Sequence, residues 1–127
     1  MTYQEFTDRQ LGMLVPDGAP RAIGAINALV LGELLDKYRL FRKYNKLNGQ
    51  GRFFYTISLF EKNTGIKRSV QTKSIEILAQ HNLISTALHG LPKRRYFWFT
   101  EENLDNILKL KEHKIPDSDF YEEALYE

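Results

Sequence analysis

Residues 56–82, "TISLFEKNTGIKRSVQTKSIEILAQHN", predict two helices joined by a very short turn. Thr56 can begin the first helix, because its hydroxyl can accept a hydrogen bond from a free backbone N–H group of the first turn. Gly65 predicts the end of that helix, since glycine adopts the left-handed backbone conformation without a steric cost. After a tight link, the second helix is expected over about residues 68–81.

The second helix divides into an apolar side and a polar side. Ile75 and Leu78 are the expected core residues, with either Val70 or Gln71 one turn earlier. The rest of its N-terminal half is mostly polar and is expected to face outward. Asn82 stands where the helix should stop, and asparagine is, after glycine, the residue most tolerant of the left-handed conformation.

Two strands joined by a tight loop are expected after the second helix. The segments "LISTALHG" and "RRYFWFT" read as strands, and the glycine and proline of "GLP" predict the reversal between them. Because side chains alternate along a strand, either Phe97 and Phe99 or Tyr96 and Trp98 face the core. We expect the two phenylalanines to face inward, because neither needs a hydrogen-bond partner when buried.

A long apolar segment over residues 23–49, "IGAINALVLGELLDKYRLFRKYNKLNG", predicts a leading helix. A helix that is apolar on two sides is buried on two sides, so it is either the central core helix or part of a dimer interface. Asn48 and Gly49 are expected to end it. Its apolar residues recur at helical spacing and widen onto a second face, at Ile23, Ile26, Leu29, Val30, Leu31, Leu34, Leu35, Tyr38 and Phe41.

The remaining segments complete one domain. "RFFYT" reads as a short strand, and Thr100 followed by two glutamates predicts the start of a last helix. We divide the chain into an N-terminal arm over residues 1–22, a folded domain over 23–115 and an acidic tail over 116–127. A length of 127 residues suits a single domain with one modest core.

The charges of the chain are strongly segregated. Residues 37–95 hold thirteen lysines and arginines against two acidic residues, whereas residues 101–127 hold nine acidic residues against three lysines. This distribution predicts a middle region that binds a polyanion and an acidic tail. The tail is either a solvated end or a segment that docks on a protein partner or on the basic face of its own chain.

Other classes of function lack their usual sequence signals. There is no cysteine, and His81, His89 and His113 do not have the spacing of metal ligands. Neither a nucleophile elbow nor a glycine-rich phosphate loop is seen, so we expect no enzyme, no metal and no cofactor. No apolar run is long enough to span a bilayer and no secretory signal is seen, which favours a cytoplasmic protein without a membrane partner.

The order of these elements predicts an α+β winged helix-turn-helix. It would have a long leading helix and a short antiparallel wing of two to three strands. In such an arrangement, the second helix of the pair can enter the DNA major groove. A hairpin with a basic tip can then lie on the phosphate backbone or in the minor groove beside it.

Residues 53–104 resemble the winged-helix domain of phage and plasmid replication proteins of Gram-positive bacteria, which include DnaD-like replisome organisers and replication initiators. The resemblance starts with the leading helix, covers roughly residues 23–104 and rests on short motifs, which are "YT", "TG", "NLI", "GLP" and "YF". Lys67 and Asn82 depart from the pattern, where the family commonly has a serine or threonine and a glycine. We expect no second helical domain of the kind that larger members carry, so the resemblance implies DNA binding and not recruitment of a helicase or its loader.

The resemblance implies a set of DNA-binding residues. Base edges would be approached by Ser69, Gln71 and Thr72, and phosphates would be contacted from the helix by Lys67, Arg68 and Lys73. The wing would contact the backbone through Lys93, Arg94 and Arg95.

We therefore expect a double-stranded DNA-binding protein of phage or plasmid replication or its control, acting as a homodimer through the 23–44 helix. A transcriptional repressor with the same fold fits the sequence equally well. A third alternative, from another class, is a winged helix that binds a protein partner and never touches DNA.

Overall fold

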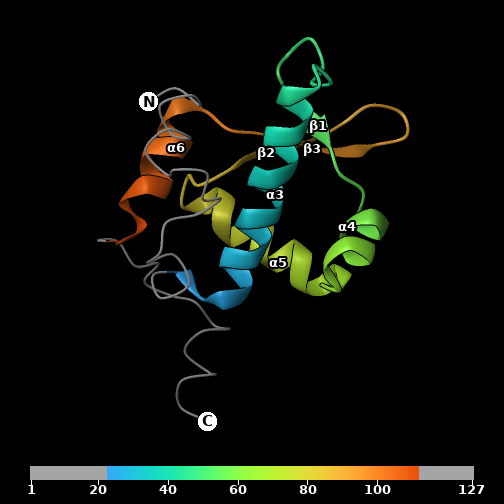
Figure 1. Cartoon of the computed structure of the whole chain (residues 1–127). Helices are drawn as coiled ribbons and strands as arrows, with labels where there is room; N and C mark the ends of the chain where they lie inside the picture. Colours follow the sequence, from blue (N-terminus) through green and yellow to red (C-terminus); the bar gives the residue numbers. More distant parts are fainter. Residues whose placement is uncertain (1–22, 112–127) are drawn as a thin grey trace.

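The structure, a computed structural model, describes residues 23–111, and the expectations for the N-terminal arm and the acidic tail lie outside these residues. The described region is an α+β fold with four α-helices and a three-stranded antiparallel sheet, which confirms the predicted class (Figure 1). The elements are α3 (Ala25–Lys43), β1 (Phe53–Phe54), α4 (Ile57–Thr64), α5 (Arg68–Gln80), β2 (Ser85–His89), β3 (Arg94–Trp98), α6 (Glu101–Leu108) and the 3-10 turn η1 (Lys109–Lys111). No helix of this region has the length and the apolar character that crossing a membrane requires.

Helix α3 is the central core helix, as one of the two alternatives predicted. Its buried side chains include Val30, Leu31 and Leu34, none of which has any exposed surface. Leu29 is an exception to the predicted second apolar face, because 61% of its surface is exposed. The two sides of the helix are thus buried largely within the chain itself.

The predicted end of α3 at Asn48 and Gly49 is wrong, because the helix stops at Lys43. Asn45 adopts the left-handed conformation with φ 59°, and the Lys46 N–H group bonds back to the Phe41 carbonyl at 2.8 Å. This is the pattern by which asparagine can end a helix in place of glycine. Asn48 instead shapes the following loop, where its side-chain oxygen accepts bonds from the backbone of residues 50 and 52.

The predicted boundaries of α4 and α5 are confirmed. The Thr56 hydroxyl accepts a bond from Leu59 N at 3.1 Å, and Gly65 ends α4 in the left-handed conformation with φ 77°. Lys67 caps α5 without a side-chain hydrogen bond, and Asn82 follows it with φ 57°. These short-range features leave only residues 65–67 between the two helices.

The sheet has the order β1–β3–β2 and lies across α3 in Figure 1. Phe97 pairs with Phe53 on one side and with Thr86 on the other. Phe97 and Phe99 are buried, which confirms the predicted facing of β3. The expected start of the last helix is also confirmed, because Thr100 and Asn103 form a reciprocal capping box.

A buried polar contact joins α3 to α5. The Ser74 hydroxyl donates to Asn27 Oδ1 at 2.7 Å, and Asn27 Nδ2 donates to the Ile23 carbonyl at 2.8 Å. Both side chains are buried, so neither can exchange its partner for water. The contact therefore fixes the register of the two helices.

Substitution of Ser74→Ala should lower the free energy of unfolding by about 1–3 kcal/mol, because it removes the hydroxyl partner of the buried Asn27 carboxamide. The double variant Asn27→Leu with Ser74→Ala should lose less than the sum of the two single variants, since it removes both partners. Urea unfolding of the four proteins measures this difference. A fully additive double variant would show that the pair is not coupled.

Candidate nucleic-acid interface

The N-terminal half of α5 presents most of the residues predicted to contact DNA. Those that are exposed line an open depression between α4 and α5, together with two acidic residues, Glu61 of α4 and Glu76 of α5. The exposed residues are Lys67, Arg68, Ser69, Thr72 and Lys73. The structure thus brings together five of the predicted positions, and it adds two carboxylates beside them.

The start of α5 is electrostatically suited to an anion. No acidic residue lies in its first turn, and Lys67 leaves the free N–H groups of that turn without a side-chain acceptor. The helix dipole adds partial positive charge at the same place, where Lys67 and Arg68 carry full charges. The Thr72 hydroxyl donates to the Arg68 carbonyl at 2.9 Å, so its oxygen can still accept a bond from a ligand.

Gln71 does not approach a ligand, and the prediction that it reads base edges is wrong. Its side chain is fully buried, and its amide nitrogen donates to the Ile66 and Ile57 carbonyls at 2.7 and 3.2 Å. Its oxygen accepts a bond from Arg95 Nη2 at 3.0 Å. Gln71 is therefore the core residue one turn before Ile75, which the sequence had left open between it and Val70.

Arg95 is also wrongly predicted as a phosphate contact at the wing tip. It lies on the same side of β3 as the buried Phe97, with its guanidinium 5.4 Å from the centre of that ring. Its Nε and Nη2 atoms each donate to the Tyr55 carbonyl at 3.3 Å, in addition to the bond to Gln71. Burial lowers the pKa of Arg95 from its ordinary value. Strand alternation could have revealed this, because an inward Phe97 places Arg95 inward as well.

The bond between Gln71 and Arg95 joins the first turn of α5 to the turn end of the β2–β3 hairpin, because Arg95 is the second residue of β3. Lys93 in the turn and Arg94 at the start of β3 are both exposed. In Figure 1, the β2–β3 turn extends to the right above α4, and the α4–α5 turn lies below α4. Gln71 and Arg95, both predicted to contact DNA, thus form a bond that holds α5 and the hairpin, with their exposed basic residues, in position.

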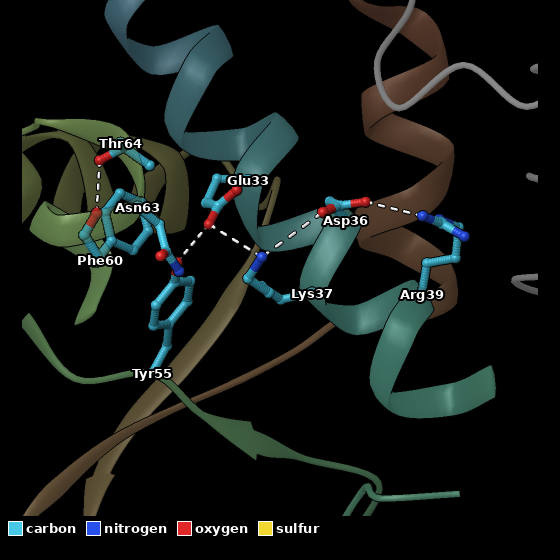
Figure 2. Close-up of polar contacts among 8 residues, drawn as sticks. All are labelled: Glu33, Asp36, Lys37, Arg39, Tyr55, Phe60, Asn63 and Thr64. Atoms are coloured by element: carbon cyan, nitrogen blue, oxygen red, sulfur yellow. Dashed lines mark hydrogen bonds and ion pairs between the residues drawn. The ribbon is translucent and has the colours of Figure 1, made fainter. Parts of the chain in front are cut away.

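Helix α4 is tied to α3 by a second polar cluster, shown in Figure 2. The Tyr55 hydroxyl donates a short hydrogen bond to Glu33 and accepts a bond from Asn63 Nδ2 at 2.8 Å. Lys37 lies 3.5 Å from the same Glu33 carboxylate. Burial and the bond to Glu33 raise the pKa of Tyr55 above its ordinary value. The cluster fixes α4, which forms one wall of the depression.

The charged residues of the described region are unevenly placed. Within residues 23–111, every acidic residue lies on a helix, and the strands and their connecting loops hold none. The basic residues occur on both helices and loops. The region around the sheet is therefore cationic without any compensating carboxylate of its own segments.

Comparisons of the chain with protein-family models, with curated proteins and with solved structures found no match. Among the described residues, no group of three histidine, aspartate or glutamate side chains is placed to hold a metal ion.

Substitution of Gln71→Leu should lower the free energy of unfolding by about 1–3 kcal/mol, because the half-buried Arg95 guanidinium loses one of its acceptors and the Ile57 and Ile66 carbonyls lose the Gln71 donor. Gln80→Leu is the matched control, since Gln80 is exposed on the same helix. Chemical unfolding followed by circular dichroism compares the two. Equal stability of both variants would contradict the structural importance of the Gln71 bond.

Substitution of Tyr55→Phe should remove a pH-dependent part of the stability. Because folding raises the pKa of Tyr55, the folded state holds this proton more tightly than the unfolded state, whose tyrosine pKa is about 10. The contribution is therefore complete below that pH and declines as pH rises above it. Urea unfolding from neutral pH to above about pH 10 should show a steeper loss for the parent protein than for Tyr55→Phe. Parallel curves would refute the assignment.

Proposed function

We propose that this protein is a winged-helix domain that binds double-stranded DNA. Helix α5 lies in the major groove, and the β2–β3 hairpin is the wing, which contacts the phosphate backbone. The observation that carries the proposal is the hydrogen bond between Gln71 and Arg95, which joins the turn end of the wing to the first turn of α5. This bond supports a single rigid unit of α5 and the β2–β3 hairpin, and both elements carry exposed basic residues.

The residues assigned to the contacts differ in their chemistry. Lys67, Arg68 and Lys73 at the helix, and Lys93 and Arg94 at the wing, neutralise phosphates and provide affinity. Ser69 and Thr72 are the polar side chains left to approach base edges, since Gln71 is buried. Only two short side chains then read the bases. We therefore expect that a large part of the binding free energy comes from phosphate contacts, which do not depend on DNA sequence.

The biological setting that we propose is phage or plasmid DNA replication or its control, which rests on the resemblance of residues 23–104. A repressor with the same fold would use the same surface. Footprinting on the DNA of the source element separates the two, because protection at a replication origin supports the first and protection at a promoter supports the second.

Glu61 and Glu76 favour a second candidate function, in which the same depression binds a protein partner. Their carboxylates repel phosphates but could pair with basic groups of a protein. Salt dependence distinguishes the candidates, because a complex with about six phosphate contacts loses roughly three decades of affinity between low and moderate salt. A protein that shows no salt-dependent DNA binding would fit the second candidate.

Substitutions Arg68→Gln and Lys93→Gln should each weaken duplex binding for any sequence and reduce the slope of log affinity against log salt by about 1. Arg39→Gln is the control, because Arg39 lies on α3 and pairs with Asp36 at 3.0 Å. Fluorescence anisotropy with a labelled duplex gives both quantities. The assignment fails if the control variant loses as much affinity as the other two.

The proposal includes a homodimer formed through α3. Leu29 is the leucine of this helix that stays exposed, and it is the natural centre of such an interface. Substitution of Leu29→Glu should shift the protein from dimer to monomer in sedimentation equilibrium, because it would bury an unpaired charge. A parent protein that sediments as a monomer at all concentrations would remove the dimer from the proposal.

A further inference from the structure

The sheet has a second face that the core does not use, and Arg94 is the one proposed duplex contact that lies on it. Phe54, Tyr96 and Trp98 alternate with the buried Phe53 and Phe97, so their side chains lie on the opposite side of the sheet. Phe54 is 44% exposed, and the other two are partly exposed. Three aromatic rings on a face that the core does not cover form an unusual apolar surface for a small domain.

Cationic groups are interleaved with these rings. The Arg52 guanidinium lies 3.7 Å from the centre of the Trp98 ring, and the Arg94 guanidinium lies 4.7 Å from that of Phe54. The strand register explains this order, because Phe54 is opposite Tyr96 and His89 is opposite Arg94. We call this surface the outer sheet face, defined by Arg52, Phe54, His89, Arg94, Tyr96 and Trp98.

The amino-acid composition of the outer sheet face suits a bound anion. No acidic residue occurs anywhere in residues 37–60 or 77–100, which contain all three strands and their adjoining loops. The two arginines are therefore not neutralised by a carboxylate from their own segments. A ligand that matches this surface must combine flat rings with negative charge.

We propose that the outer sheet face binds single-stranded nucleic acid. Unpaired bases stack on aromatic rings and on guanidinium planes, and the phosphates between them pair with arginine. The Arg52 guanidinium already lies over the Trp98 ring, so a base can extend this stack as a further layer. In a duplex the bases are stacked on one another, so a duplex can use the arginines of this face but not its rings.

Trp98 provides a direct probe, because it is the single tryptophan of the chain. Addition of a single-stranded oligothymidylate of about 12 nucleotides should quench its fluorescence, since this length covers a typical stacking site. A parallel titration with oligouridylate of the same length tests whether the outer sheet face distinguishes DNA from RNA. Quenching of Trp98 by either oligonucleotide supports the proposal. A duplex of matched length should leave the emission nearly unchanged.

Substitution of Phe54→Leu should weaken binding of the oligothymidylate by about five- to a hundredfold, which corresponds to the loss of one base–aromatic stack. The matched control is Tyr44→Leu, because Tyr44 is also an exposed aromatic with a cation beside it, Lys43 Nζ at 5.5 Å from the ring centre, but it lies outside the sheet. The control should bind as the parent does. Circular dichroism of both variants verifies that the fold is retained.

The proposal is overturned if the oligonucleotides do not quench Trp98, or if Phe54→Leu and Tyr44→Leu bind equally well. Such a result would mean that the cation–aromatic pairs only cover the rings. The proposed duplex function is tested separately, because Arg68→Gln should weaken duplex binding and leave oligothymidylate binding unchanged. Loss of one activity without the other therefore shows which of the two assignments is wrong.

Discussion

The hydrogen bond between the Gln71 carboxamide and the Arg95 guanidinium is the contact on which the arrangement of this domain depends. A half-buried guanidinium is costly unless its N–H groups find acceptors. The Gln71 oxygen and the Tyr55 carbonyl accept bonds from Arg95 Nε and Nη2, whereas Nη1 is buried without a partner among the described residues. The Gln71 nitrogen in turn satisfies two carbonyls near the ends of α4. One pair of side chains thus connects α4, α5, β1 and β3.

Strand β3 contributes to both surfaces proposed for nucleic acid, because Arg94 is assigned to the wing and also lies on the outer sheet face. Its alternation places Arg95 and Phe97 toward the core and places Arg94, Tyr96 and Trp98 on the other side. Neighbouring arginines therefore serve different purposes, since Arg95 bonds the hairpin to Gln71 of α5 and Arg94 remains available to a ligand. If both proposals hold, the domain can contact a duplex at α5 and the wing while an unpaired strand lies on the outer sheet face.

Buried amide side chains recur at the junctions between elements. Asn27 joins α3 to α5, and Asn103 joins α6 to the segment after α5 by donating to the Asn82 carbonyl at 2.8 Å. Asn103 also accepts a bond from the Ser85 hydroxyl at 2.8 Å. A carboxamide can donate and accept at once, so it can satisfy backbone and side-chain groups of two elements together. In a domain with one modest core, such contacts specify how the elements meet.

The sequence by itself determined the features that depend on neighbouring residues. Thr56 and Thr100 begin helices and Gly65 ends one, because these effects involve bonds or backbone conformations within a few positions. The alternation of β3 left two facings open, and the burial of Phe97 followed from the preference for the side chain that needs no hydrogen-bond partner. Strand alternation could place Arg95 inward and the helical spacing left Gln71 open as a core residue, but only the tertiary structure brought these two side chains, 24 positions apart, together as partners. A polar side chain is buried only when the fold supplies its partners, and that condition cannot be evaluated locally.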